Sequence, residues 1–382
     1  MRASPRIALV AGETSGDQLG GALMAALRDR YADVRFAGIG GSHMKARGLD
    51  AWWDSDELAV MGLVEVLSHL PRLLGLRKKL RKRLLEYKPD IFIGIDAPDF
   101  NLGLEKRLRA AGITTVHYVS PTVWAWRKGR VRTVGTAADM VLCMFPFEPA
   151  LYRAIDIQAR YIGHPIADEI PDRSDKGGAR TALGLDLNKP CIAILPGSRR
   201  SEIERLAPHL LGAAELLARR DPELQFVAPM AGRSVWDLFE SALDRYRSVD
   251  CKCIDGQARV AIAAADLVLC ASGTATMETM LINRPMVVVY RFSPTTYAIA
   301  RGLRLVKSRF IAMPNILAGE ELVPELEQHE VTAERIAAQA MALLDDPGRR
   351  TVIAQKFSAL HATLRNDASE AAANCIQTLI ES

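Results

Sequence analysis

The chain has 382 residues, of which 49% are hydrophobic and 25% are charged, and its formal net charge is +4. This composition is typical of a folded protein with two or three globular domains and excludes a disordered or fibrous chain. The net charge is small for the length, so the chain as a whole lacks the basic excess of a nucleic-acid-binding protein.

Cysteine content and hydropathy narrow the class further. The six cysteines lie mostly within apolar runs, and only Cys251 and Cys253 are close, without the second ligand pair that a zinc site needs. We therefore expect reduced core thiols and no metal site. No stretch reaches about 18 uninterrupted apolar residues, and the first apolar run is too short for a secretion signal. We expect a cytoplasmic protein.

Along the chain, short apolar runs rich in β-branched residues alternate with helical patterns. This alternation is typical of parallel sheets with helices on both faces, the α/β class. Ten such runs are expected to be strands, five in each half: residues 6–12, 34–40, 90–96, 114–120 and 140–145, then 191–197, 224–230, 251–255, 267–272 and 286–290.

Proline, glycine and mixed charge interrupt this alternation between residues 161 and 180, which indicates an interdomain linker. We therefore expect a first domain over residues 1–165 and a second over 166–345. The tail, residues 346–382, is helical by its apolar period. We expect its helices to pack back across the domains.

The segment of residues 62–87 is both oily and basic, with eight Leu or Val followed by six Lys or Arg. From Pro71, a favourable first helical residue, four leucines recur at helical spacing and predict a stripe that faces the core. Those leucines are Leu73, Leu76, Leu80 and Leu84. A crossover helix packed on the first sheet explains them, but it leaves an apolar surplus: Leu63, Val66, Leu67, Leu70 and Leu74.

Ligands of open parallel sheets bind at the carboxyl ends of the strands, so the loops there are the candidate sites. After the first strand, the glycines of "AGETSGDQLGG" allow close backbone approach, and Thr14, Ser15 or Asp17 can cap the next helix. A binding role and a simple helix cap are equally expected there. After the third strand, Asp96 stands where a general base would be placed, and Asp99 or Asn101 is expected to cap the following helix.

Two loops of the second half have the chemistry of anion sites. Ser198 and Arg199 open a helix whose N–H groups, with the Arg199 or Arg200 guanidinium, could hold a diphosphate; a solvent-exposed arginine pair is the alternative. In "ASGTATMETML", the residues Ser272, Gly273 and Thr274 open another helix and suit a second phosphate contact. Glu278, one turn later, can accept both hydroxyls of a ribose; a simple interaction with the helix dipole is the alternative. Two such loops in one domain favour a nucleotide.

Seven blocks along the chain resemble the lipid-A-disaccharide synthases: "VAGETSGDQLG", "ELAVMGLVEVL", "GIDAPDFN", "HYVSPTVWAWR", "LPGSRRSEIE", "SGTATMETML" and "PNILAGEELVPEL". The resemblance implies a GT-B glycosyltransferase with two Rossmann-like domains facing a cleft. It also implies the reaction, in which UDP-2,3-diacylglucosamine and 2,3-diacylglucosamine 1-phosphate give UDP and a β-1,6-linked disaccharide 1-phosphate. A UDP-sugar 2-epimerase of the same fold and a non-catalytic sugar-nucleotide binding protein remain as alternatives.

Residue roles also follow from the resemblance. Asp96 aligns with the proposed catalytic base, which would act in a single inverting displacement. In the first loop, the resemblance implies functional roles for Glu13, Ser15 and Gly16. In the donor half, it implies roles for Arg199 and Asn315, and the wider GT-B pattern implies one for Glu278. UDP contacts are expected from Ser198, Arg199, Ser272, Gly273, Thr274, Glu278 and Asn315. Neither a cofactor nor a metal is expected.

The implied substrates are lipids of the cytoplasmic leaflet of the bacterial inner membrane, which suggests a function for the apolar and basic segment of residues 62–87. We hypothesise that it docks the first domain on that surface, through buried apolar area and attraction of basic residues to anionic lipid. The family further suggests a homodimer, with no nucleic-acid partner. The residues expected at the membrane are Leu63, Val66, Leu67, Leu70, Leu74, Arg77, Lys78 and Lys79.

Overall fold

The computed structural model describes residues 4–58, 63–121, 130–155, 157–292 and 309–381, and for residues 63–69 and 130 it describes the backbone alone. The chain divides into two compact units. The first unit combines Met1–Asp168 with Leu364–Ser382, and the second is Glu169–Thr363. The sequence placed the first boundary three residues earlier and treated residues 346–382 as a separate tail, whereas in the structure the chain returns to the first unit at Leu364.

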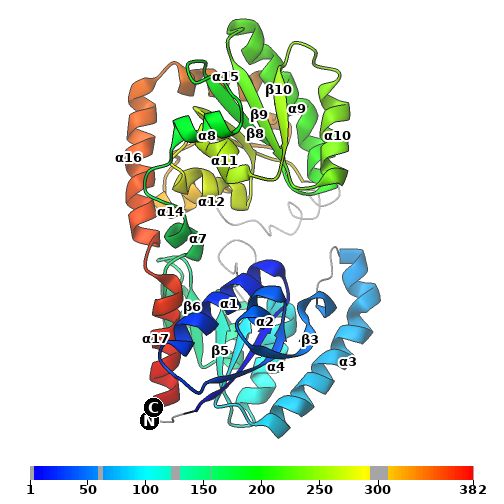
Figure 1. Ribbon diagram of the computed structural model, residues 1–382, viewed down its shortest axis with the longest axis vertical. Coiled ribbons are helices and arrows are strands. Elements are labelled where there is room, and N and C mark those ends of the chain that lie inside the picture. The colour runs from blue at the N-terminus through cyan, green and yellow to red at the C-terminus, as the bar shows by residue number, and fades with distance from the viewer. Residues whose placement is uncertain (1–3, 59–62, 122–129, 156, 293–308, 382) are drawn as a thin grey trace. The chain divides into compact units, whose positions relative to one another are not determined.

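The first unit contains a seven-stranded parallel sheet in the order β3-β2-β1-β4-β5-β6-β7 (Figure 1). The strands are β1 Arg6–Ala11, β2 Arg35–Gly40, β3 Leu49–Asp54, β4 Ile91–Ile95, β5 Thr114–Tyr118, β6 Met140–Cys143 and β7 Gln158–Tyr161. The helices are α1 Thr14–Arg28, α2 Ser42–Ala46, α3 Leu63–Tyr87, α4 Pro98–Arg109, α5 Arg130–Ala137, α6 Pro149–Tyr152, α7 Pro165–Glu169 at the junction, and α17 Ala368–Glu381.

The second unit contains a six-stranded parallel sheet in the order β10-β9-β8-β11-β12-β13. Its strands are β8 Cys191–Leu195, β9 Gln225–Met230, β10 Cys251–Asp255, β11 Leu267–Ala271, β12 Met286–Tyr290 and β13 Glu325–Glu327. Its helices are α8 Lys176–Ala182, α9 Arg200–Arg220, α10 Arg233–Leu243, α11 Ala258–Ala264, α12 Thr274–Leu281, α14 Met313–Ala318, α15 Ala333–Leu344 and α16 Pro347–Leu364.

All ten expected strands are present, and three further strands were missed. The missed strands β3, β7 and β13 each lie at an edge of their sheet. An edge strand has one side open to solvent and carries polar residues, as in "QARY" and "ELE", so it lacks the apolar run that marks a central strand. The six cysteines are free, as expected.

The alternation of side chains along β1 builds a core on each face of the first sheet. Ile7 and Leu9 pack in one cluster with residues of α1 and α17, such as Ile376. Ala8 and Val10 pack in the opposite cluster with leucines of α3 and α4. In Figure 1, α17 accordingly runs beside α1, so the C-terminal helix completes one face of the N-terminal sheet.

Helix α3 begins at Leu63 rather than at Pro71, which lies inside it, so the expected helix start was wrong. The core stripe is confirmed at three of its four leucines: Leu80 and Leu84 are fully buried, and Leu76 is 8% exposed. Leu73 is only half-buried and lines a cavity instead. By contrast, Leu70 and Leu74 are 43% and 46% exposed. The side chains of Leu63, Val66 and Leu67 lie outside the described residues. In the described part of the chain, no helix is both long enough and apolar enough to cross a membrane.

Candidate functional site

Each sheet reverses its strand order once, at the β1/β4 pair in the first unit and at the β8/β11 pair in the second. At such a point the two adjacent strands continue in opposite directions, which opens a crevice outside their carboxyl ends. The four loops that the sequence singled out follow these four strands. Within each unit, the two candidate loops therefore lie side by side.

In the first unit, a cavity of about 300 Å³ lies at the β1/β4 crevice. Glu13, which follows β1, and Asp96, which follows β4, both line it, together with leucines of α3. Of the other two residues expected in the first loop, Ser15 is exposed and Gly16 is buried, and neither lines this cavity. Gly16 instead packs closely on the strand ends, where a Cβ atom would lie 3.4 Å from the Cβ of Ala11.

The backbone around Asp96 is unusual. Asp96 and Ala97 have φ values of 50° and 43°, in the left-handed region that non-glycine residues seldom occupy. The Asp96 N–H donates to the carbonyl of Tyr118 at 2.8 Å, and the Asn101 amide donates to the Asp96 carbonyl at 2.8 Å. The expected cap was therefore wrong: α4 begins after Ala97 without a side-chain cap, and Asn101 fixes the turn that carries Asp96.

The expected caps of α1 are also absent. The helix begins after Glu13 with no side-chain hydrogen bond, so Thr14, Ser15 and Asp17 all lie inside it. The buried Asp17 carboxylate instead accepts N–H groups from residues 41, 43 and 44 at 2.7–3.1 Å. From the first turn of α1, it thus caps the start of the neighbouring helix α2.

A buried ion-pair candidate was missed by the sequence reasoning. Glu105 of α4 and His117 of β5 are both fully buried, with Oε1 and Nδ1 2.7 Å apart. Burial raises the pKa of Glu105, and the neighbouring His117 opposes that rise. Gly94 of β4 makes room for the carboxylate, since a Cβ there would lie 2.1 Å from Glu105 Oε1. The pair packs against β4 at Gly94, and neither residue lines the cavity.

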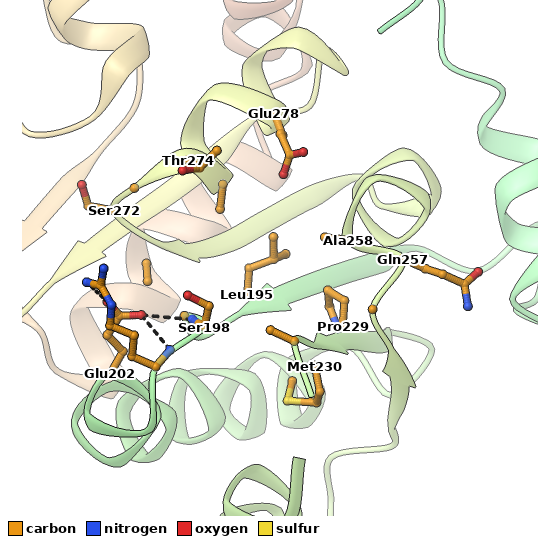
Figure 2. Close-up of a pocket in the computed structure, with 17 residues that line it drawn as sticks. Leu195, Ser198, Glu202, Pro229, Met230, Gln257, Ala258, Ser272, Thr274 and Glu278 are labelled. Carbon is orange, nitrogen blue, oxygen red and sulfur yellow. Dashed lines mark hydrogen bonds and ion pairs between the residues drawn. The ribbon is translucent and has the colours of Figure 1, made fainter. Parts of the chain in front are cut away.

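In the second unit, a cavity of about 450 Å³ lies at the β8/β11 crevice (Figure 2). Six of the seven residues expected to contact UDP line it: Ser198, Arg199, Ser272, Gly273, Thr274 and Glu278. The end of β9 and the start of α11 close its other sides with residues such as Met230 and Gln257. The structure therefore brings both anion-type loops and the acidic residue to one cavity.

The two helix N-termini of this cavity differ. The N–H groups of Ser198 and Arg199 donate to Glu202 Oε2 at 3.0 and 3.2 Å, as the dashed lines of Figure 2 show. Glu202 of α9 thus takes two of the N–H groups that the sequence analysis expected to be free there. The Arg199 side chain stays 76% exposed, with only a 3.5 Å pair to Glu202. Helix α12 has no side-chain cap at Gly273, so no capping side chain covers the start of its first turn.

Glu278 is held in place by a residue that the sequence analysis did not select. Arg259 Nε lies 2.8 Å from Glu278 Oε1, and Arg259 Nη1 lies 2.9 Å from Glu169 Oε2. The Glu278 side chain is only 18% exposed. This pairing fixes the orientation of the carboxylate at the cavity wall. Glu169, Arg259 and Glu278 are far apart in the sequence, so their contact could not be predicted from local spacing.

Asn315 lies outside the cavity. It is fully buried, and its amide donates to the Val323 carbonyl at 2.9 Å and to Glu325 Oε1 at 2.7 Å. Glu325 also accepts the N–H groups of Ile311 and Ala312, and the Ser272 hydroxyl donates to the Ile311 carbonyl at 3.2 Å. Asn315 is therefore connected to the cavity through the segment that holds Ser272.

Comparison with known proteins gives one consistent family. A family model described as lipid-A-disaccharide synthetase matches residues 7–376. A lipid-A-disaccharide synthase of Xanthomonas campestris is 50% identical over 382 residues, covering 100% of this chain and 87% of the relative. One from Xylella fastidiosa is 48% identical over 380 residues, covering 99% of each chain.

Solved structures show the same fold at low identity. A UDP-GlcNAc 2-epimerase from Neisseria meningitidis bound to UDP-GlcNAc has a TM-score of 0.62 at 13% identity, covering 99% of this chain and 100% of its own. MurG from Acinetobacter baumannii has a TM-score of 0.59 at 16% identity, covering 98% and 99%. At identities this low, the likeness shows the fold alone, which is the GT-B architecture of two Rossmann-like domains.

Proposed function

The chain belongs to the lipid-A-disaccharide synthetase family, and we propose that it transfers diacylglucosamine from UDP-2,3-diacylglucosamine to 2,3-diacylglucosamine 1-phosphate. The products are UDP and the β-1,6-linked disaccharide 1-phosphate. The observation that carries the proposal is the family match over residues 7–376. The two cavities support it, because one offers a carboxylate for an acceptor hydroxyl and the other offers anion-binding groups for a nucleotide.

Asp96 is proposed to take the proton from the acceptor 6-hydroxyl as that oxygen attacks the anomeric carbon of the donor. Attack from the face opposite UDP inverts the anomeric centre in a single displacement, so no enzyme nucleophile is needed. Two features support Asp96 in this role. Its side chain lines a cavity at the switch point, and hydrogen bonds from both sides fix its backbone.

The donor is proposed to bind in the cavity of the second unit. The Arg199 guanidinium and the open first turn of α12, with Ser272 and Thr274, would hold the diphosphate, and Glu278 would accept the ribose hydroxyls. These donors, rather than a metal ion, would stabilise the charge that develops on the departing UDP. One such preorganised donor changes the rate by roughly 10²–10³ in known enzymes.

The exposed side of α3 is proposed to meet the membrane that contains both lipid substrates. Leu70 and Leu74 are exposed and also line the cavity beside Asp96, so acyl chains of the acceptor would find apolar surface there. Lys78 and Lys79 are exposed one turn further along and would face anionic lipid. The proposal extends to Leu63, Val66 and Leu67 and places the protein on the cytoplasmic face of the inner membrane. Arg77, which the sequence also placed at the membrane, lines the cavity beside Asp96 and is not part of this proposal.

The reaction is tested by incubating the protein with UDP-diacylglucosamine, with and without the monophosphate acceptor, in detergent micelles. We expect UDP release that depends on the acceptor and is stoichiometric with disaccharide, and we expect it to survive EDTA. Epimerisation of the donor without an acceptor would instead favour a 2-epimerase. UDP binding with no conversion at all would favour a non-catalytic binding protein.

A further inference from the structure

The cavity beside Asp96 is lined by carboxylates and leucines, and Arg77 is the one cationic side chain among its lining residues. The carboxylates belong to Glu13, Asp96 and Asp99, and the leucines come from α3. Arg77 also comes from α3, one turn beyond the leucines. One cavity thus combines an apolar wall, one guanidinium and a candidate general base.

The Arg77 guanidinium has no ion-pair partner within the described chain. Its single hydrogen bond there runs from Nη1 to the Asp99 carbonyl at 3.5 Å, the long limit for such a bond. A neighbour on the same helix differs, because Arg72 pairs with Glu57 at 3.0 Å. Arg77 therefore presents donors that the protein itself leaves largely unused.

The surroundings of Arg77 make an anion favourable. The side chain is half-buried, and both this burial and the positive charge of nearby Arg107 lower its pKa, burial more strongly. Gly103 of α4 gives the guanidinium its space, since a Cβ there would lie 2.6 Å from Arg77 Nη1. A partly desolvated cation beside a like charge is unfavourable, and a bound anion would relieve that cost.

We propose that Arg77 binds the 1-phosphate of the acceptor sugar and thereby selects phosphorylated acceptors; this inference rests on the function proposed above. A guanidinium matches the oxygens of a phosphate monoester with two parallel donors. The carboxylates of Glu13, Asp96 and Asp99 repel a phosphate from the rest of the cavity. The phosphate therefore binds toward α3, and the 6-hydroxyl, carried from C5 on the other side of the ring oxygen, is directed to Asp96.

The test compares wild type, Arg77→Ala and Arg77→Lys with two acceptors in detergent micelles, diacylglucosamine 1-phosphate and the same lipid without its phosphate. For Arg77→Ala we expect kcat/KM to fall about 10- to 100-fold with the phosphorylated acceptor, mainly through KM, and to change little with the other. Arg77→Lys keeps the charge without the fork and should recover part of the loss. Lys106→Ala, an exposed cation of α4, is the matched control and should behave as wild type.

Calorimetric titration of both acceptors into the same variants reads the phosphate site without turnover. Arg77→Ala should lose the preference for the phosphorylated lipid while its UDP affinity stays unchanged. That result would support the site even if the wild type formed no disaccharide, which would instead contradict the proposed function. Equal losses with both acceptors would overturn the inference and indicate a packing role. An unchanged preference, with weaker binding to vesicles containing phosphatidylglycerol, would overturn it in favour of a lipid headgroup.

Discussion

Asp96 and Ala97 adopt left-handed backbone conformations, each of which costs of order 1–3 kcal/mol for a non-glycine residue. The surrounding structure has to offset that cost. The bonds to the Tyr118 carbonyl and from the Asn101 amide do so on both sides of the turn. The backbone that carries the carboxylate is therefore fixed relative to β4 and β5, which helps to position a general base.

Asp96→Asn tests the base directly. Asparagine tolerates the left-handed region as well as aspartate does, so the turn should survive the change. We expect kcat to fall by about 10²–10⁴-fold, the usual contribution of general base catalysis. UDP affinity, measured by calorimetry, should not change, because the donor cavity belongs to the other unit. Turnover close to wild type would remove Asp96 from the mechanism.

Arg199 and Glu278 are tested as donor contacts. Arg199→Ala and Glu278→Ala should each weaken UDP binding by about 1.5–3 kcal/mol, the value of a hydrogen bond to a charged group. Arg200→Ala is the matched control, since Arg200 is the neighbouring exposed arginine, pairs with Glu204 and does not line the cavity. Calorimetry that finds unchanged UDP affinity in both variants would place the nucleotide elsewhere.

At this scale the sequence could predict which residues follow the central strands, because apolar runs and turn residues mark those positions. It could not predict their partners. Glu202 takes two N–H groups that were expected to be free, and Arg259 reaches Glu278 from another helix. Asp17 caps the neighbouring helix α2 across the fold. Such contacts depend on tertiary packing, which local spacing does not encode.

Among the elements, α3 has two distinct faces. Leu80 and Leu84 are fully buried on the sheet, whereas Leu70 and Leu74 are nearly half exposed beside the first cavity. The period of the leucines predicted the buried face. It could not fix where the helix begins, because Pro71 is favourable at a first helical position but is also tolerated inside a helix when surrounding contacts offset its missing hydrogen bond.

The membrane proposal for α3 is tested with Leu70→Ser combined with Leu74→Ser. At about 1.5–3 kcal/mol for each buried leucine, losing both should weaken binding to anionic vesicles by at least about 100-fold. Thermal unfolding should change little, because both side chains are exposed. Leu187→Ser, which alters an exposed leucine of the second unit, is the control. Vesicle binding that stays at the wild-type level would contradict the proposal.

At the scale of the whole molecule, the segment around residues 164–168 holds the C-terminal segment in the first unit. The Asp168 carboxylate accepts the N–H groups of residues 366, 367 and 368 at 2.7–3.1 Å and so caps α17. The His164 N–H donates to the Leu364 carbonyl at 2.8 Å. These contacts join residues about 200 positions apart. The sequence could therefore predict a helical tail but not the residue at which the tail rejoins the first unit.

His164 at this junction makes stability depend on pH. Burial lowers its pKa to about 4, with Asp168 acting in the opposite direction. The unfolded state, with a pKa of about 6.5, therefore binds a proton that the folded state does not, and stability falls as the pH drops between these values. We expect this residue to remove about 2 kcal/mol between about pH 7 and pH 5.

Urea unfolding of wild type and His164→Gln at both pH values measures this contribution. The variant should lose less stability on acidification than wild type, by about 2 kcal/mol. His329→Gln, at an exposed histidine, should lose as much as wild type. A His164→Gln variant with the wild-type dependence on pH would contradict the assignment.

The most direct test of the account is the structure of the product formed by the wild-type protein from UDP-diacylglucosamine and diacylglucosamine 1-phosphate. Mass spectrometry and NMR should identify one disaccharide that retains the 1-phosphate, with a β linkage to the 6-oxygen and one UDP released per linkage. A product with an α linkage would contradict the single inverting displacement at Asp96. Recovery of epimerised donor, with the acceptor unchanged, would contradict glycosyl transfer itself.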